Sequence, residues 1–112
     1  MKRGEIWMAT LDPIQGSEQA GTRPILVLQA DALNVFLRTA VVVPFTSNLS
    51  WSRYPFCVKI LKGEGGLTSD SVALCQQVRA IDITRLIRFM GQVSDATLNQ
   101  IEQGLCVSVD LV

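Results

Sequence analysis

Two segments of this chain hold residues whose types and spacing could support catalysis. The first is residues 16–24, GSEQAGTRP, where Glu18 lies between two glycines and Arg23 directly precedes a proline. The second is the pair Thr46 and Ser47, which follows the apolar run TAVVVPF. A guanidinium, a carboxylate and hydroxyl groups can together stabilise negative charge, accept a proton and donate hydrogen bonds.

The chain contains no histidine. The commonest general acid or base at neutral pH is therefore missing, and so are Ser-His-Asp and Cys-His arrangements. Cys57, Cys75 and Cys106 are an odd number without a CxxC pair, and we expect small core residues that stay reduced rather than a zinc site. Catalysis must rely on arginine, carboxylates, hydroxyls or water, and we expect no metal and no cofactor.

The first segment belongs to a connection, residues 12–23, that is longer than the two to five residues usual for a hairpin. Gly16 and Gly21 are suited to be the hinges of a mobile flap, with Gln19 and Thr22 among the polar groups at its tip. The alternative is a long hairpin connection whose glycines serve only backbone geometry. The unusual length favours the flap.

Arg23 and Thr46 each have a structural as well as a functional interpretation. Pro24 restrains the residue before it to extended geometry, which would fix the direction in which Arg23 leaves the chain. The alternative is a structural arginine that pairs with Glu18 or Asp12. The Thr46 hydroxyl, in turn, could simply cap a turn.

Short apolar runs rich in β-favouring residues alternate with turns that contain glycine, proline or serine, and this pattern predicts strands. The predicted strands span residues 5–11, 24–30, 39–45, 55–61, 71–78 and 87–93. Short turns are predicted at 31–34 and near 83–85. Such a series of strands predicts a mainly β fold, a small and strongly bent sheet or barrel of five to seven strands.

One helix is predicted to begin after Ser94, a good N-cap, with Asp95 at the positive end of the helix dipole. Its apolar stripe consists of Leu98, Ile101 and Leu105. Gly104 is expected to weaken the last turn. The chain would therefore end in an α-helix that packs on the β-structure.

The 112 residues are 48% hydrophobic and 18% charged, enough for a single domain, 1–112, with one core. The N-terminus lacks the apolar stretch of a secretory signal, and we expect a cytoplasmic protein with no membrane contact. Ten basic and ten acidic residues give zero net charge, which argues mildly against nucleic-acid binding. A locally basic face remains compatible with this balance, because seven of the ten cations are arginines.

Several segments together resemble, in order and spacing, the MazF/PemK family of toxins from type II toxin–antitoxin modules. They are RGEIW at 3–7, DP at 12–13, GSEQAGTRP at 16–24, VVPFTS at 42–47, QVRAID at 77–82 and RL at 85–86. The resemblance implies a homodimer of SH3-like barrels of the MazF/CcdB type, with short helices and a C-terminal α-helix. It also implies metal-independent cleavage of single-stranded RNA at short sequences, silenced by the C-terminal tail of a cognate, MazE-like antitoxin.

The resemblance assigns catalysis to Arg23 and Thr46 and matches the family's loop glutamate with Glu18. Some PemK-like members use an arginine and an aspartate on a later strand, but this chain has Leu74 and Gln76 there. The version with arginine and threonine is therefore favoured. In it the RNA 2′-OH attacks the phosphate, Arg23 stabilises the added charge, and Thr46 aligns the attack. The base is Glu18, water or a phosphate oxygen.

RNA binding by this family implies flat side chains that stack on unpaired bases. Trp51 and Arg53, with Tyr54, are the predicted platform, although Trp51 and Tyr54 would equally suit the core or a dimer interface. The remaining predicted RNA contacts are Gln19, Ser47, Gln76 and Gln77, with Arg79 as a further candidate. Hydrophilic positions of a β-ladder would look the same in the sequence.

Two other interpretations remain open. The same barrel occurs in toxins that resemble CcdB, which bind and poison a topoisomerase without cleaving anything. A homologue that binds an antitoxin but has lost its activity is the second. The GSEQAGTRP segment favours the ribonuclease over the CcdB-like toxin, and the presence of both Arg23 and Thr46 argues against a loss of activity.

Overall fold

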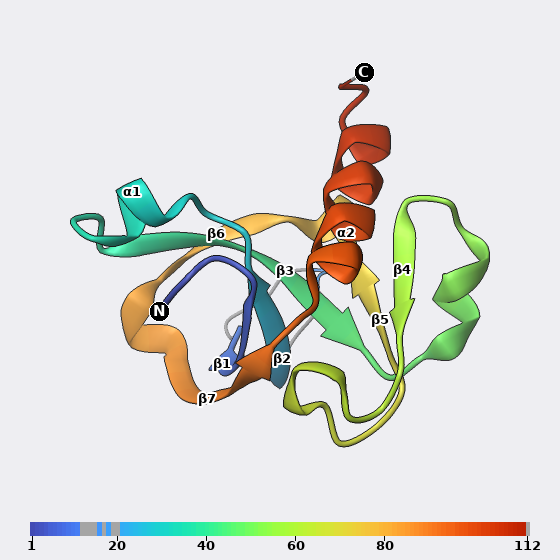
Figure 1. Ribbon diagram of the computed structural model, residues 1–112, viewed down its shortest axis with the longest axis horizontal. Coiled ribbons are helices and arrows are strands. Elements are labelled where there is room, and N and C mark those ends of the chain that lie inside the picture. Colours follow the sequence, from blue (N-terminus) through green and yellow to red (C-terminus); the bar gives the residue numbers. More distant parts are fainter. Residues whose placement is uncertain (12–15, 17, 19–20, 112) are drawn as a thin grey trace.

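The computed structural model describes residues 1–11, 16, 18 and 21–111 (Figure 1). The strands are β1 (Glu5–Thr10), β2 (Thr22–Val27), β3 (Thr39–Thr46), β4 (Cys57–Ile60), β5 (Ser71–Leu74), β6 (Arg79–Asp82) and β7 (Leu86–Gln92). The α-helices are α1 (Asp31–Asn34) and α2 (Asp95–Ser108). Four short 3₁₀ helices connect them in the described residues: η1 (Leu49–Arg53), η2 (Glu64–Gly66), η3 (Cys75–Gln77) and η4 (Ile83–Arg85).

The strands form one antiparallel, seven-stranded sheet in the order β4-β5-β3-β2-β1-β7, with β6 paired to β3. The bend of this sheet centres on β3, the longest strand at eight residues. One edge of β3 pairs with β6 through residues 39–42 and then with β5 through residues 45–46. The mainly β fold with short helices and a C-terminal helix is therefore confirmed.

Alternation along the strands divides the apolar side chains between two sides of the sheet. Leu26, Val43 and Phe45 belong to the cluster that includes Ile101 of α2. The neighbouring residues in sequence point the other way and form a second cluster with Leu11. It includes Ile25, Val27, Ala40 and Val42. The sheet thus has one side that α2 covers and one that it does not.

Two predicted strands differ from the structure. The segment 71–78 is not one strand, because η3 interrupts it: the Val78 N–H donates to the Cys75 carbonyl at 3.3 Å. Conversely, β2 begins at Thr22 instead of residue 24 and ends at Val27, so Arg23 is part of the sheet and not of the loop before it. The remaining predicted strands, the turn at 31–34 and the helical turn near 83–85 are confirmed to within two residues.

The terminal helix begins as predicted, because the Ser94 hydroxyl accepts a hydrogen bond from the Thr97 N–H at 3.2 Å. Gly104 does not end the helix, and α2 continues to Ser108. A Cβ at position 104 would lie 2.8 Å from the Cys75 sulfur and 3.0 Å from the Phe56 carbonyl oxygen. Glycine here allows α2 to lie against η3 and the start of β4.

The three cysteines are free, as predicted, but only two belong to the core. Cys57 and Cys75 are buried, whereas Cys106 is half-exposed on α2. The pKa of the Cys75 thiol is raised to about 12, mainly by burial and to a smaller extent by the neighbouring Cys57. Among the described residues, no helix is long and apolar enough to cross a bilayer.

Candidate active site

Arg23 and Thr46 lie at the ends of two neighbouring strands. The register between β2 and β3 pairs Leu26 with Val43 and Ile25 with Pro44. Ile25 and Pro44 are the last paired residues at this end; continued by two positions, the register would place Arg23 level with Thr46, and side chains on opposite positions point to the same side of a sheet. The register therefore places the two residues predicted for catalysis at the same end of neighbouring strands.

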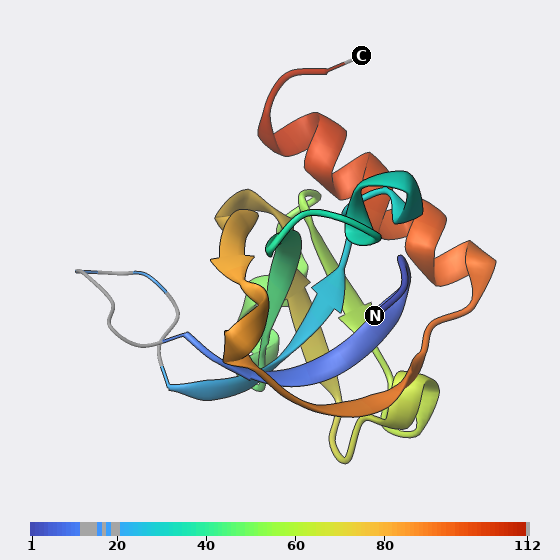
Figure 2. The same cartoon turned by 90° about the vertical axis from the view of Figure 1, so that its left-hand side faces the viewer.

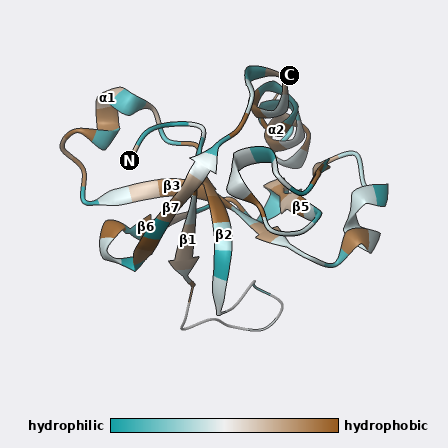
Figure 3. Cartoon of the chain, turned by 60° about the horizontal axis from the view of Figure 1, so that its bottom comes forward, coloured by the Kyte–Doolittle hydropathy of each residue, from teal (hydrophilic) through white to brown (hydrophobic). Residues whose placement is uncertain are grey.

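Small neighbours leave space for the guanidinium of Arg23. On the β1 side, Arg23 is paired with Ala9, which is fully buried, and on the β3 side it faces Thr46. Arg23 itself is half-buried. Figure 3 shows how β2 changes from hydrophobic to hydrophilic as it approaches the loop before it. A charged side chain thus lies within β2 itself, two residues before the buried positions Ile25, Leu26 and Val27.

Both residues face the side of the sheet that α2 does not cover. Arg23 is two and four positions from Ile25 and Val27 on β2, and Thr46 is four positions from Val42 on β3. Because side chains an even number of positions apart point to the same face of a strand, Arg23 and Thr46 face the side of the second cluster. In Figure 2, α2 lies at the upper right, whereas β2 begins at the lower left, away from the helix. The candidate site is therefore on the side of the sheet that carries the second cluster and that α2 does not cover, which we call the open side.

The Thr46 hydroxyl is held by the turn that follows β3. Thr46 is only 7% exposed, and its Oγ1 accepts a hydrogen bond from the Asn48 N–H at 3.2 Å. A hydroxyl that accepts through its oxygen still has its own proton to donate. Thr46 therefore both caps the turn, as in the structural alternative, and can donate to a bound group, as in the functional one.

Arg79 adds a second guanidinium to the same side of the sheet. The β3–β6 register pairs it with Val42, whose side chain points to the open side. Arg79 is half-buried. Two cationic side chains thus lie on this side of the sheet, Arg79 beside the middle of β3 and Arg23 on β2, although the protein as a whole has zero net charge. The locally basic face expected from the arginine content stays a prediction.

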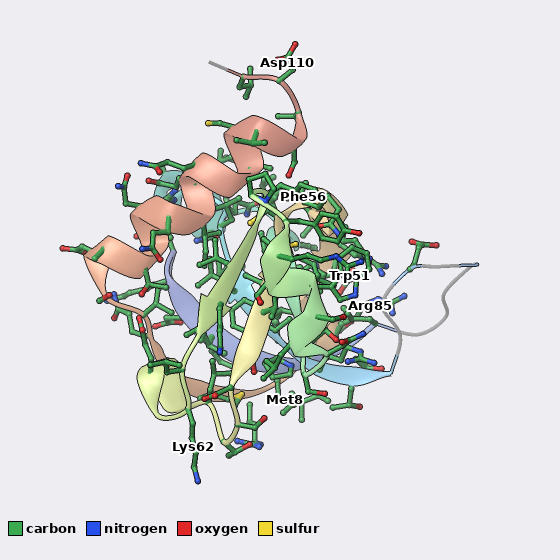
Figure 4. All side chains as sticks on the ribbon, turned by 90° about the vertical axis from the view of Figure 1, so that its right-hand side faces the viewer. Met8, Trp51, Phe56, Lys62, Arg85 and Asp110 are labelled. Carbon is green, nitrogen blue, oxygen red and sulfur yellow. The ribbon has the colours of Figure 1, made fainter. Side chains whose placement is uncertain are left out.

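An aromatic cluster lies beside this end of β3. Val72, which pairs with Thr46 across β3 and β5, belongs to a small core on which Trp51, Tyr54 and Phe56 pack. The rings of Trp51 and Tyr54 are 5.4 Å apart, and those of Tyr54 and Phe56 are stacked at 5.1 Å. Figure 4 shows Trp51 and Phe56 on the side of the barrel formed by η1 and β4.

The rings of this cluster are all half-buried and pack on a small core, which supports the core interpretation of Trp51 and Tyr54 in part. Their role as a platform for bases stays a prediction. Arg53 lies over the Tyr54 ring at 4.7 Å from its centroid and donates to the Tyr54 hydroxyl at 2.8 Å. Because Arg53 and Phe56 both stack on Tyr54, a base would meet Trp51 or Arg53 more easily than Tyr54.

The residues that follow β5 lie next to the aromatic cluster. Leu74 is fully buried within the same small core, which leaves it no polar role. Gln76 is half-buried in η3, and its Oε1 accepts a hydrogen bond from the Cys57 thiol at 3.6 Å. Burial raises the pKa of the Cys57 thiol, which keeps it protonated as a donor. The Gln76 amide nitrogen is then directed away from Cys57.

The other predicted site residues are less closely defined. Glu18 and Ser47 are exposed, and Gln77 is half-buried in η3. Gln19 lies outside the described residues, as does most of the loop predicted to be a flap. Within the described part of the chain, no three His, Cys, Asp or Glu side chains are grouped to hold a metal ion.

Two residues of the site region were not anticipated from the sequence. Asn48 lies after the predicted strand 39–45 and was given no role, yet its N–H donates to the Thr46 hydroxyl oxygen. The sequence signal for it is an asparagine two residues before a serine at a helix start, which is typical of a capping turn. Phe56 was assigned to a strand, but it lies before β4 and supports Tyr54.

A hollow of about 360 Å³ lies between β4 and α2. Its lining residues are Pro55, Cys57, Val58, Lys59, Gln100, Gln103, Gly104 and Val107. They include no carboxylate, hydroxyl or arginine, so they lack the groups that catalysis in this chain requires. The Arg23–Thr46 region remains the best candidate for an active site.

Comparison with known proteins identifies the family of the chain. The family model for PemK-like, MazF-like toxins of type II toxin–antitoxin systems matches residues 2–109. A protein of Staphylococcus saprophyticus named endoribonuclease MazF is 34% identical over 111 residues, which cover 99% of this chain and 92% of that protein. The motifs around Arg23 and Thr46 fall within both matches.

Solved structures show the same fold. The crystal structure of MazF (Form-I) from Deinococcus radiodurans has a TM-score of 0.85 and 25% identity, and the match covers 98% of this chain and 96% of that one. A crystal structure of MazE-MazF (Form-II) from the same organism has a TM-score of 0.78 and 26% identity, with coverage of 100% and 97%.

Proposed function

Because the chain belongs to the PemK-like, MazF-like toxin family of type II toxin–antitoxin systems, we propose that it is an endoribonuclease that cuts single-stranded RNA at short sequences. The observation that carries this proposal is the position of Arg23 level with Thr46 on the open side of the sheet. The whole chain, 1–112, would form one toxin domain.

The proposed reaction uses the nucleophile that RNA itself supplies. The 2′-OH loses its proton and attacks the adjacent phosphorus, the bond to the 5′-oxygen breaks, and the products are a 2′,3′-cyclic phosphate and a 5′-hydroxyl. Arg23 forms paired hydrogen bonds with two phosphate oxygens and stabilises the charge that develops on them. Its charge is permanent, because the pKa of arginine lies above about 12. The Thr46 hydroxyl donates to a phosphate oxygen and aligns the attack.

Two proton transfers complete the reaction. In this proposal Glu18 accepts the proton of the 2′-OH when the loop closes over the RNA; water or a phosphate oxygen is the alternative acceptor. The departing 5′-oxygen receives a proton with the help of Arg23. No step requires a metal ion, because the nucleophile comes from the substrate and the positive charge comes from the guanidinium.

Substrate binding would use the residues around the end of β3. Trp51 and Arg53 provide flat surfaces for unpaired bases, and the half-buried Gln76 presents its amide nitrogen as a donor. Gln19, Ser47 and Gln77 are the further proposed contacts. Two arginines on the open side supply contacts to the RNA phosphates in a protein of zero net charge.

The proposed partners are a second copy of this chain and a cognate antitoxin. A relative from Deinococcus radiodurans was crystallised as MazE-MazF, and another from a mycobacterial species was crystallised in complex with its cognate antitoxin. We propose that an antitoxin tail covers the Arg23–Thr46 region of a homodimer and thereby blocks access of RNA.

The test is incubation of the pure protein with a long unstructured RNA in EDTA, followed by mapping of the new ends. We expect cuts at a short recurring sequence, each with a 2′,3′-cyclic phosphate. Absence of cleavage at high protein concentration would overturn the proposal and favour a toxin that binds a topoisomerase or an inactive antitoxin-binding homologue. Cleavage that requires a divalent ion would overturn the mechanism.

A further inference from the structure

We propose that Asn48 is a positioning residue that fixes the Thr46 hydroxyl and the Trp51 ring relative to each other. The inference rests on the proposed function, because it concerns how the reacting phosphate and the neighbouring base are placed together. Asn48 itself is exposed and lies between the end of β3 and the start of η1. It would act through its two neighbours and not on the RNA directly.

Asn48 makes contacts in both directions along the chain. Its backbone N–H donates to the Thr46 Oγ1 at 3.2 Å, and its carbonyl oxygen accepts from the Trp51 N–H at 3.4 Å. Its side-chain Oδ1 accepts from the Ser50 N–H at 3.2 Å and from the Ser50 hydroxyl at 2.7 Å. One residue therefore links the catalytic hydroxyl to the helix that carries the base platform.

The side chain controls the two backbone contacts. As the N-cap of η1, Asn48 has extended backbone angles, φ −76° and ψ 95°, which its hydrogen bonds to Ser50 hold in place. The segment around it is exposed, so the core does not restrain the peptide plane of Asn48. Loss of the Oδ1 contacts would free that plane, and its N–H would no longer fix the rotation of the Thr46 hydroxyl.

The matched substitution is Asn48→Ala, which keeps the backbone N–H but removes the side-chain acceptor. We expect the single-turnover rate of RNA cleavage to fall about tenfold, the loss that a released capping contact can produce. We also expect weaker binding, by about threefold, of an RNA with 2′-deoxyribose at the mapped cleavage site, because Trp51 is less well placed.

A double-mutant cycle separates positioning from a general structural effect. Thr46→Val removes the hydroxyl while it keeps the side-chain shape. In the Thr46→Val background the hydroxyl that Asn48 positions is gone, so Asn48→Ala should leave the residual cleavage rate unchanged. It should still weaken RNA binding, because Trp51 is less well placed. Equal loss of rate in both backgrounds would overturn the proposal, because Asn48 would then act independently of Thr46.

Further variants distinguish a loss of positioning from a loss of folding. Asn48→Ser should restore most of the rate, because a serine oxygen can accept from the Ser50 N–H without adding charge. Ser50→Ala removes only one of the two contacts to Oδ1, and we expect a decrease of about twofold. Asn99→Ala, the same change at an exposed position of α2, is the control and should have no effect on rate or affinity.

The outcomes distinguish this inference from the proposed function. If wild-type protein cleaves RNA in EDTA and Asn48→Ala has the wild-type rate and affinity, the positioning role is wrong while the ribonuclease stands. If the wild type does not cleave at all, the proposed function has failed and takes this inference with it. Circular dichroism spectra of all variants should overlay, and a Ser50→Ala rate identical to wild type would also count against the proposal.

Discussion

On the side of the sheet that α2 covers, charged groups serve the fold. Arg3 donates to the Leu28 carbonyl at 2.9 Å and forms an ion pair with Glu102 of α2. The carboxylate of Glu64 accepts from the N–H and the hydroxyl of Ser94, both at 3.2 Å, at the start of α2. These contacts attach the helix and the N-terminal segment to the sheet.

On the open side, Arg23 and Arg79 lie on strands, and Thr46 is held by a turn. No helix of the length of α2 packs over this side in the described chain. The difference indicates that stability and chemistry reside on opposite sides of one sheet. Substitutions on the two sides should then affect different measurements, and this is the comparison that the following predictions test.

The largest expected effect comes from replacing an arginine on each side of the sheet, in two separate variants. Arg23→Ala should lower the cleavage rate about 10³-fold, the loss seen when a charge-stabilising donor is removed, with little change in the melting temperature. Arg3→Ala should leave the rate unchanged and lower the free energy of unfolding by about 1–2 kcal/mol, because it loses a buried carbonyl contact and a partly exposed ion pair. Thermal melts and initial rates of the two variants give the comparison.

The arginine pair is also the sharpest way to contradict the separation of the two sides. If Arg23→Ala lowered the melting temperature as much as Arg3→Ala, the Arg23 guanidinium would be a structural group. If Arg3→Ala lowered the cleavage rate, the covered side would contribute to catalysis. Arg23→Lys is a useful intermediate, because lysine keeps the charge but cannot form the paired contact. Its cleavage rate should lie between those of the wild type and Arg23→Ala.

The next largest effect is expected on the covered side, at Gly104, where α2 lies close to Cys75. Gly104→Ala should destabilise the protein by about 1–3 kcal/mol, because its Cβ would lie 2.8 Å from the Cys75 sulfur. Cleavage below the melting transition should be unchanged. Urea unfolding measures the change, with Gln103→Ala at a neighbouring exposed position as the control.

A double mutant shows whether the contact with Cys75 causes the loss. Cys75→Ala removes the sulfur, so Gly104→Ala should cost less in that background by at least about 0.5 kcal/mol. The Phe56 carbonyl, 3.0 Å from the same Cβ position, would remain and prevents full recovery. Strict additivity of the two changes would show that the penalty has another origin, such as strain in α2.

Gly104 also illustrates what the sequence could and could not predict. A glycine near a helix end signals a weak last turn through its intrinsic propensity, which is a local property. Its actual role depends on Cys75 and Phe56, which are distant in sequence. The helix start at Ser94 was predictable, by contrast, because a cap involves residues three positions apart.

The strands show the same limit. Apolar alternation located β1, β3 and β7, but it could not reveal the 3₁₀ turn inside residues 71–78, where the apolar and polar pattern continues across η3. Arg23 and Thr46 were selected individually from their neighbours and by family resemblance. That they lie level with each other depends on the register between two strands, which no short stretch of sequence encodes.

The smallest predicted effect concerns pH and the N-terminal end of α2. Burial raises the pKa of Glu64, but hydrogen bonds from Thr97 and from the N–H and hydroxyl of Ser94 outweigh it, so the net pKa is below the ordinary value of 4.5. A depressed pKa stabilises the folded state above the unfolded value, and this contribution disappears as the pH falls through the folded value. Protonation should therefore loosen the start of α2 only in acid.

Glu64→Gln should consequently cost about 0.5 kcal/mol at pH 7, a value in the range for partly exposed charged contacts. The difference from wild type should shrink as the pH falls from 5 to about 3, because wild-type Glu64 then becomes neutral as well. Urea unfolding at several pH values measures it, with Asp110→Asn at an exposed carboxylate as the control. A difference that stayed constant down to pH 3 would mean that shape, and not charge, determines the contact with Ser94. The cleavage rate of Glu64→Gln at pH 7 should equal that of the wild type and of Asp110→Asn, since Glu64 belongs to the covered side.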